Sequence, residues 1–486
     1  MKAVNRALPL LASEQVGPKG WINNIYVFQL DTDYDASRIA SILLSAWKNF
    51  RRRTPMVGVE VIPEDIEQQP AGMFKLQAYE DGEVEDFVFR DHRDDADMPT
   101  FAQLHEQGFP NGAMDDEKLC LRKLGGPWPN FGVDRLATTM MQVNMIKGGL
   151  LLNHLCLHMM GDGAGMWKLT ELFADEVRRA QGLPIETPAE VTVDDREKLL
   201  RSTGKYDLAA FAAAHPEWAH LPFVPPGFPD ALVNASHHAH VFRFSSEAIA
   251  ALKDECAPSN VHLLRNQASV TPLPGFISTN DALTALLWRS IQRAQHTDAS
   301  QIAADKMSLC QVALDTRRRA YDEIHPHTLG NILGYTATTL SLSEVVSPEK
   351  ASLADLAVMV RMAVNKCGKQ YHDELAYYIE NMDNVNCLAG TCFLDMPGAN
   401  MLQSNWSKFD HYGIEWGPEF GHSMKALRFP ASGICAGFQV IMPTPPDAPK
   451  GTVDVLVDVT EDAWQHLLVD ETWNRFALNP TTTVYK

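Results

Sequence analysis

The chain has 486 residues, more than one hydrophobic core usually organises, so we expect two domains. Its composition is that of an ordinary globular protein, and no apolar run approaches the roughly 20 residues that a membrane span needs. The formal net charge of −19 at pH 7 argues against nucleic acid as a partner, because phosphate binding needs a basic face. One phosphorylated co-substrate is still allowed, since it needs only a local positive pocket.

Eight cysteines are spread along the chain, and no two of them form a CxxC pair. Unpaired thiols at such spacing are typical of a protein from a reducing compartment. Residues 7–12 loosely imitate a signal peptide, but their apolar part is short and is interrupted by Pro9. We therefore expect a cytoplasmic protein that has no membrane partner and is a monomer.

The N-terminal part of the chain alternates between strand and helix patterns. Residues 22–30 are rich in β-branched and aromatic side chains, which favours a strand. Apolar residues recur at helical spacing over residues 39–50, and residues 57–62 return to a strand pattern. The charged stretch 90–97 is typical of a solvated turn.

Residues 149–158 form the most informative strand pattern. They read Gly-Leu-Leu-Leu-Asn-His-Leu-Cys-Leu-His, which is apolar on both faces and predicts a buried central strand. Glycines follow at positions 161, 163 and 165, and a helix with an apolar inner face is predicted from Met166 to Val177.

A proline-rich stretch over residues 202–234 separates the two halves of the chain and predicts a long crossover. In the second half we predict strands at 239–244, 332–342 and 451–459, and a helix at 281–293 that is capped by Asn280 or Asp281. The resulting division is an N-terminal domain over residues 1–205, a crossover linker over residues 206–236 and a C-terminal domain over residues 237–486.

His158 stands at the end of the buried strand, where a glycine-rich turn begins. Such strand ends commonly open into a cleft, and an imidazole there is suited to deprotonating a hydroxyl near neutral pH. Asp162, four residues further on, can orient the imidazole or brace the turn. The His-x-x-x-Asp-Gly pattern is weak by itself, and a structural histidine explains it equally well.

Other constellations in the sequence do not complete a known site. Residues 161–165 lack the Gly-Lys-Ser/Thr ending of a phosphate loop, and residues 421–425 lack the second glycine of a nucleophile elbow. Histidines gather at positions 237, 238, 240, 325 and 327 without acidic or cysteine partners at ligand spacing, so we predict no metal site. His154 and Cys156 share a strand face with His158, which places them either along the same cleft or in the core.

Several further segments, taken in order along the chain, carry a resemblance to a known family. They are Arg90 to Asp95, Val143 to Leu150, the His158-Met159-Met160-Gly161-Asp162-Gly163 motif, Ser278 to Leu283, Leu287-Trp288-Arg289, Leu314 to Arg317, Leu329-Gly330-Asn331 and Ile441-Met442-Pro443. Together they resemble the BAHD acyltransferases, coenzyme-A-dependent enzymes of plants and fungi. Within that family the chain looks most like the fungal trichothecene 3-O-acetyltransferases and their relatives.

The resemblance implies an α/β fold with two similar domains, each a mixed sheet flanked by helices, and an active-site channel between them. It implies transfer of an acyl group, here expected to be acetyl, from acyl-CoA to a hydroxyl of a small secondary metabolite, with His158 as general base and no metal. In the family the motif aspartate points away from the cleft and braces an arginine, so Asp162 is expected to be structural.

The resemblance also suggests residues around the two substrates. Arg317, Ser278 and Thr279 are expected on the coenzyme side, and His154, His411, Tyr412 and Gly413 along the substrate channel.

One segment departs from the family pattern. The family's DFGWG motif corresponds to His411-Tyr412-Gly413-Ile414-Glu415, where only Gly413 matches strictly. The family aspartate, which pairs with an arginine like Arg317, is replaced by His411, and Asp410 stands one residue earlier. The departure bears on coenzyme handling rather than on the base.

Three alternative functions stay open at this point. A cyclase or isomerase could use the same fold and base without an acyl donor. A condensation-type enzyme could use a carrier-bound thioester, although Leu157 stands where such domains have their first histidine. A non-catalytic binding protein could retain the fold, but the intact His158 and Asp162 argue against it.

Overall fold

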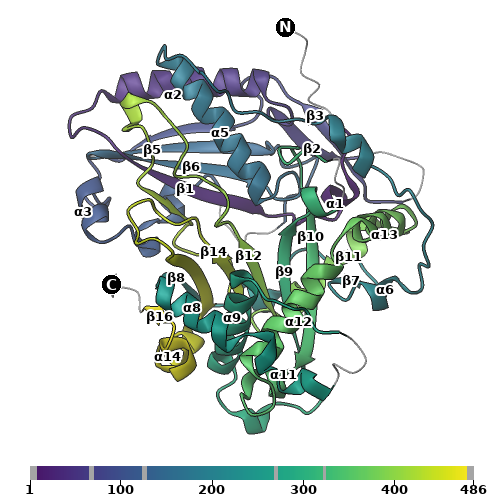
Figure 1. Ribbon diagram of the computed structural model, residues 1–486. Helices are drawn as coiled ribbons and strands as arrows, with labels where there is room; N and C mark the ends of the chain where they lie inside the picture. The colour runs from purple at the N-terminus through teal and green to yellow at the C-terminus, as the bar shows by residue number, and fades with distance from the viewer. Residues whose placement is uncertain (1–7, 65–69, 123–127, 267–271, 321–323, 479–486) are drawn as a thin grey trace.

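The computed structural model describes residues 8–64, 70–122, 128–266, 272–320 and 324–478, and it contains two mixed β-sheets with helices packed on them (Figure 1). We call them the N-terminal and C-terminal sheets. Two two-stranded pairs complete the β-structure of the described chain. One is β2 (Val59–Pro63) with β3 (Phe74–Ala78), and the other is β7 (Trp218–His220) with β11 (Leu388–Gly390).

The N-terminal sheet has five strands in the order β13-β1-β6-β5-β4. Their bounds are β1 Trp21–Gln29, β4 Phe87–Asp91, β5 Thr139–Ile146, β6 Gly149–Leu157 and β13 Ala426–Arg428. Strand β6 lies in the middle, antiparallel to β1 and β5, and every one of its residues is buried. The sequence therefore predicted this central strand correctly. The charged stretch 90–97 begins inside β4, because Arg90 and Asp91 still belong to that strand.

Two long helices lie together across one face of the N-terminal sheet (Figure 1). They are α2 (Ala36–Arg53) and α5 (Gly163–Ala180), which follow β1 and β6 in the chain. Trp47 and Phe50 of α2 meet Phe173 of α5 edge to face, with ring centroids 6.1 and 5.5 Å apart. This aromatic contact packs the middle of α5 against α2.

The C-terminal sheet has seven strands in the order β10-β9-β12-β14-β15-β8-β16. Their bounds are β8 His237–Phe244, β9 Met307–Asp315, β10 Leu333–Ser341, β12 Met401–Asn405, β14 Phe438–Ile441, β15 Val453–Thr460 and β16 Ala477–Leu478. Strand β12 is parallel to both of its neighbours, β9 and β14, and the other pairings in this sheet are antiparallel. The sheet is therefore mixed, as the resemblance implied.

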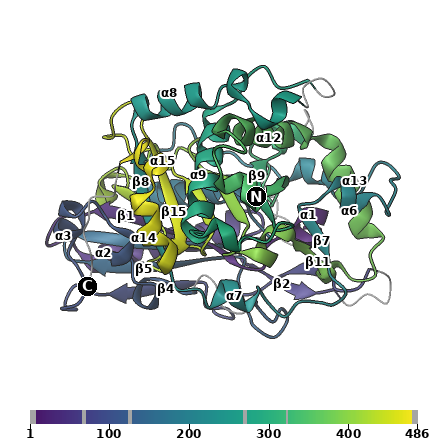
Figure 2. The same ribbon diagram turned by 90° about the horizontal axis from the view of Figure 1, so that it is seen from below.

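Helix α9 (Thr279–Gln295) is the centre of the helical layer on the C-terminal sheet. It packs against α8 (Ser246–Glu255), α12 (Leu353–Lys366) and α14 (Glu461–Val469), as Figure 2 shows from below. Its N-cap is Ser278, not the predicted Asn280 or Asp281. The Ser278 hydroxyl accepts a hydrogen bond from the backbone amide of Asp281, and the Asp281 carboxylate accepts one from the backbone amide of Ser278.

The other α-helices of the described chain follow in sequence order. They are α1 Ala12–Gln15, α3 Phe101–Glu106, α4 Asp116–Leu119, α6 Phe211–Ala214, α7 Asp230–Val233, α10 Arg317–Ala320, α11 Leu342–Val346, α13 Lys369–Glu380 and α15 Glu471–Asn474. The predicted linker 206–236 contains α6, β7 and α7, and β7 pairs with β11 of the second half. Among the described residues, none of the helices is long and apolar enough to cross a membrane.

Residues 406–429, which we call the crossing segment, leave the C-terminal sheet and complete the N-terminal one. Its last strand, β13, pairs with β1 through the register Ile25–Arg428. Trp416 and Phe420 are buried in the N-terminal core, where both rings meet Phe28 edge to face. The two halves of the chain therefore share one hydrophobic core. The division at residues 205 and 236 remains a proposal.

Candidate active site

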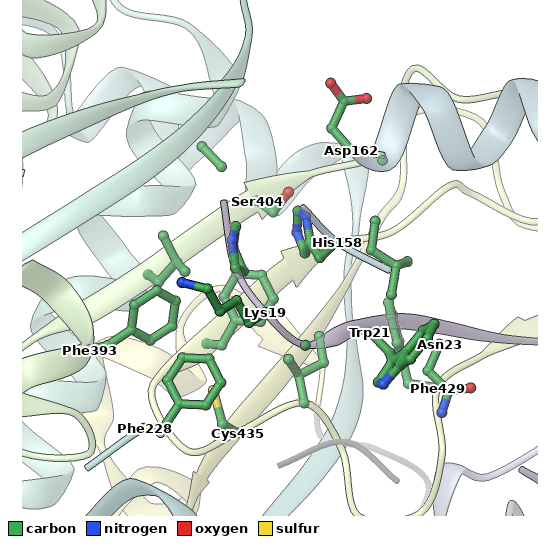
Figure 3. A pocket seen from close by; sticks show the side chains of 18 of the residues that line it. Lys19, Trp21, Asn23, His158, Asp162, Phe228, Phe393, Ser404, Phe429 and Cys435 are labelled. Carbon is green, nitrogen blue, oxygen red and sulfur yellow. The ribbon is translucent and has the colours of Figure 1, made fainter. Parts of the chain in front are cut away.

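A cavity of about 920 Å³ lies where the two sheets meet, and both halves of the chain line it. Its wall is largely apolar and aromatic, with rings from Trp21, Trp128, Phe228, Tyr335, Phe393 and Phe429. A mostly apolar cleft with a few polar groups is the usual form of a small-molecule site. His158 and Ser404 both line this cavity, and Figure 3 labels them among its side chains.

His158 follows the last residue of β6, and its backbone is held from both halves of the molecule. Its amide donates to the carbonyl of Gly20, just before β1, at 2.8 Å. Its carbonyl accepts a hydrogen bond from the side-chain nitrogen of Asn331 at 3.0 Å. Because Asn331 precedes β10 of the C-terminal sheet, the position of His158 depends on how the two halves meet.

Burial lowers the pKa of His158 below its ordinary value of 6.5. The carbonyls of His158 and Gly161 and the carboxylate of Asp162 oppose this effect without cancelling it. The imidazole is therefore neutral at neutral pH, as a general base must be. Its Nδ1 is enclosed by protein and makes no hydrogen bond to the described residues.

Asp162 is the N-cap of α5, and both of its oxygens are occupied. Oδ1 accepts from the amide of Gly165 at 2.8 Å, and Oδ2 accepts from the amide of Ile332 at 2.9 Å. The guanidinium of Arg317 donates to both oxygens, at 2.8 and 3.2 Å. Figure 3 shows the carboxylate pointing away from His158. This is the geometry of a brace between the two halves, which is the role expected of Asp162.

Arg317 does not occupy the position expected of a coenzyme-binding residue. A guanidinium has five N–H donors. Those of Arg317 go to Asp162, to Asp315, and to the carbonyls of Thr328 and Gly330. The side chain is 1% exposed and does not line the cavity. Arg317 is therefore the partner of the brace and has no donor left for a phosphate.

Ser278 and Thr279 also lie away from the cavity wall. Ser278 is committed to capping α9, and Thr279 is the first residue of that helix. The capping pattern Ser-x-x-Asp explains why this stretch stands out in the sequence. Their predicted contact with a coenzyme finds no support in their position.

His154 and His411 meet in the core instead of lining the channel. His154 bonds through Nδ1 to the hydroxyl of Thr170 at 3.1 Å, and His411 lies 3.4 Å from the hydroxyl of Tyr26. Burial lowers the pKa of His154 to about 3, and the nearby His411 ring adds to this lowering. Burial also lowers the pKa of His411 to about 3. Both rings are neutral core groups. For His154 the sequence pattern allowed either a place along the cleft or a place in the core, and the structure shows the core.

Tyr412 and Gly413 close the turn of the crossing segment and do not line the cavity either. The Tyr412 hydroxyl accepts from the amide of Leu427 at 3.3 Å, and the Gly413 amide donates to Asp410 at 2.9 Å. Asp410 is thus used locally and forms no ion pair with an arginine among the described residues. The missing motif aspartate leaves no unpaired charge on Arg317, because Asp162 and Asp315 already neutralise it.

Gly163, the last residue of the His158 motif, allows the crossing segment to approach. A Cβ at this position would lie 3.0 Å from Nε1 of Trp406 and 2.9 Å from the ring of Phe409. Nε1 of Trp406 in turn donates to the hydroxyl of Ser404 at 3.1 Å. The glycine therefore leaves room for Trp406, whose indole holds the Ser404 hydroxyl.

Three cavity or support residues were not identified from the sequence. Ser404 is the next-to-last residue of β12 and has no motif around it. Asn331 belongs to the Leu329-Gly330-Asn331 segment, which was noticed only as part of the resemblance. Lys19 stands in Gly17-Pro18-Lys19-Gly20, a turn immediately before a buried strand, and that placement was the one available signal.

Possible metal ligands do not gather among the described residues: no group of three histidine, cysteine or acidic side chains is arranged to hold an ion. His237 lies on the cavity wall and pairs with Asp458 at 2.5 Å, while His240 stacks on Trp464. The cysteines are all free.

Comparison with known proteins shows which family models and relatives the chain matches. The model of the trichothecene 3-O-acetyltransferase-like N-terminal domain matches residues 21–176, and that of the Transferase family matches residues 135–467. Trichothecene 3-O-acetyltransferase TRI101 of Fusarium sporotrichioides is 24% identical over 445 residues, which are 90% of this chain and 89% of that protein. Enoyl-CoA isomerase/hydratase claC of Penicillium crustosum is 25% identical over 472 residues, which are 95% of this chain but 50% of that longer protein.

The fold has a solved counterpart. The crystal structure of F. graminearum TRI101 complexed with coenzyme A and T-2 mycotoxin superposes with a TM-score of 0.73 at 21% sequence identity, covering 97% of this chain and 99% of that one. The two-sheet α/β fold implied by the sequence resemblance is thereby confirmed. The Transferase family model matches residues 135–467, which is more than half of the chain. The protein therefore belongs to the Transferase family.

Proposed function

We propose that this protein is an acyl-CoA-dependent O-acyltransferase that acylates a hydroxyl of a small secondary metabolite. The observation that carries the proposal is His158, a neutral imidazole fixed through its backbone at a large cavity that both sheets line. The protein's family and relatives also support the proposal, since the relative TRI101 is a trichothecene 3-O-acetyltransferase. We expect acetyl to be the transferred group.

In this proposal His158 moves one proton twice. Its Nε2 accepts the proton of the acceptor hydroxyl while the oxygen attacks the thioester carbonyl. As the carbon–sulfur bond breaks, the imidazolium returns that proton to the departing thiolate. The ring ends neutral, the thioester becomes an oxygen ester, and no covalent bond to the protein forms.

The cavity suits an acyl-CoA as co-substrate at its reactive end. The pantetheine arm is long, thin and uncharged, and it fits a wall of mixed aromatic, aliphatic and amide groups. Asn23, Ser404 and Asn405 provide polar contacts on that wall, while the aromatic rings exclude water from the thioester. Bound there, the acyl-CoA would supply an activated carbonyl carbon next to the base.

We propose Ser404 as a hydrogen-bond donor to the oxygen that becomes negative during attack. Its oxygen already accepts from Trp406 Nε1 at 3.1 Å, so its own proton is free to point into the cavity. Ser404→Ala should lower kcat about 100-fold and change KM little, the pattern of a contact made only in the transition state. Steady-state kinetics would check this, and an unchanged kcat would move the role to another group.

The test of the proposed function uses acetyl-CoA and a panel of hydroxylated secondary metabolites. Release of free thiol should depend on the acceptor, and the product should be heavier than the acceptor by one acetyl group in place of one hydrogen. A product of the same mass as the substrate would indicate a cyclase or isomerase instead. Activity with a phosphopantetheinyl carrier, but none with free acyl-CoA, would indicate a condensation-type enzyme.

A further inference from the structure

We propose that Lys19 binds a carboxylate of the acyl acceptor, so that the natural substrate is a hydroxy acid with a ring-bearing apolar body. The inference rests on the proposed function in one respect, because the ligand is an acyl acceptor only if the protein transfers an acyl group. The carboxylate site itself rests on the position of Lys19 and can be tested without any acyl transfer.

Lys19 is a lysine enclosed in the cavity wall. The residue is 8% exposed and lines the cavity, whereas lysine is almost always solvated at its charged end. Figure 3 shows its side chain among Phe228, Phe393 and His158. It is also tied to the proposed base through the chain, because the carbonyl of Gly20, the next residue, accepts the hydrogen bond of the His158 amide.

The ammonium of Lys19 has no carboxylate partner among the described residues. The acidic residues on the cavity wall are occupied elsewhere: Asp162 and Asp315 pair with Arg317, and Asp134 accepts from the backbone of Asn130. The neighbours of Nζ are the rings of Trp128 and Phe74, with centroids 4.8 and 5.8 Å away.

An unpaired charge in such a place is costly. Burial lowers the pKa of Lys19 to about 8, which still leaves most of the side chain charged at neutral pH. The aromatic faces compensate only part of the lost hydration. An incoming carboxylate would restore a charge-assisted hydrogen bond in a water-poor site, where that bond is strong.

The surroundings of Lys19 favour the acceptor as the source of the carboxylate. The coenzyme phosphates lie at the far end of the pantetheine arm from the thioester, whereas Lys19 is on the wall beside His158. The rings of Trp128, Phe228 and Phe393 offer flat apolar faces for a ring system, more surface than a short acyl group can use. A carboxylated acyl group, such as malonyl, has the same chemistry and is separated by the experiment.

The first experiment measures binding of 2-naphthoate and of its uncharged counterpart 2-naphthamide by calorimetry, in a His158→Ala background and without acyl-CoA. We expect naphthoate to bind at least ten times more tightly than naphthamide. Lys19→Met should remove that preference and leave naphthamide binding unchanged, and Lys19→Arg should retain it. Lys253→Met, which removes an exposed lysine from α8, is the charge-matched control and should change the affinity for neither naphthoate nor naphthamide.

Equal binding of the two probes by the His158→Ala protein would overturn the proposal, and so would an equal loss of both in Lys19→Met. Circular dichroism and the thermal midpoint of each variant confirm that it is folded. If binding behaves as expected but no acyl transfer is found, the proposed function fails and the carboxylate site stands.

The second experiment locates the carboxylate during turnover. Hydroxy acids and their methyl esters are compared as acceptors with acetyl-CoA, and malonyl-CoA is compared with acetyl-CoA as donor. We expect a preference for the free acid that Lys19→Met abolishes. A preference for malonyl-CoA that disappears in Lys19→Met, with no preference among acceptors, would place the carboxylate on the donor and overturn the acceptor assignment.

Discussion

At the scale of single residues, His158 combines two properties that a general base needs. Its burial keeps the ring neutral, and its backbone hydrogen bonds to Gly20 and Asn331 fix where the ring can point. Asp162 contributes to the position of the turn rather than to the proton transfer, since both of its oxygens serve Arg317 and backbone amides. The residue that acts and the residues that hold it are therefore separate in this site.

The pH dependence of the reaction follows from the direction of the His158 shift. The base is active when neutral, so kcat/KM should rise as pH increases through the pKa of His158 in the free enzyme. Because burial lowers that pKa, the acid limb should lie below pH 6.5, with a plateau at neutral pH. A kcat/KM profile in buffers of constant ionic strength checks this. An acid limb centred above pH 7 would contradict the assignment.

Asn331 should act as a positioning residue, because its side chain bonds to the His158 carbonyl and not to the imidazole. Asn331→Ala should lower kcat about tenfold, with a smaller change in KM, since misplacing the base affects the reacting geometry more than binding. The matched control is Asn386→Ala, which removes a similar bond from a side-chain amide to the carbonyl of Gly72. Equal kinetic effects of both substitutions would mean that the loss is one of general stability.

At the scale of elements, the start of α5 is where the two halves of the protein are fastened. The helix is capped by Asp162, which Arg317 contacts from the short helix after β9. Gly163 gives the crossing segment room to pack against the same turn. The motif is thus a structural joint as well as the place of the base.

The buried pair of Asp162 and Arg317 should dominate the stability of this joint. Replacing Arg317 with methionine leaves the fully buried Asp162 carboxylate without its counter-charge, which should lower the free energy of unfolding by about 3–5 kcal/mol. Arg38→Met breaks the solvent-exposed pair with Glu419 and should lower the free energy of unfolding only slightly. Urea unfolding of both variants provides the comparison, and equal losses would refute the importance of the buried pair.

The sequence predicted those elements whose pattern is local. The apolar run of β6 and the helical spacing of α2 were both recognised, because each pattern is contained in consecutive residues. The partner of Arg317 and the core position of His411 could not be found this way, since both depend on segments that meet only in the folded chain. The pairing of β13 with β1 joins residues some 400 positions apart in the sequence, and three residues of strand carry no pattern of their own.

At the scale of the whole molecule, the cavity exists because shared structure holds the two sheets together. The crossing segment supplies β13 and two buried aromatic rings to the N-terminal core, and the Asp162–Arg317 pair adds a second link between the two halves. The cavity wall alternates between residues of both halves, so neither half alone presents a complete site. An acceptor and an acyl-CoA would meet at this boundary.

The measurement that tests the central claim most directly is the rate of acetyl transfer by His158→Ala beside the wild-type protein, with one acceptor that the wild type uses. We expect kcat to fall by about 10²–10⁴-fold, while acetyl-CoA binding and the thermal midpoint stay close to wild type. His422→Ala, which replaces an exposed histidine of the crossing segment, should retain full activity. Turnover by His158→Ala at the wild-type rate would contradict the account.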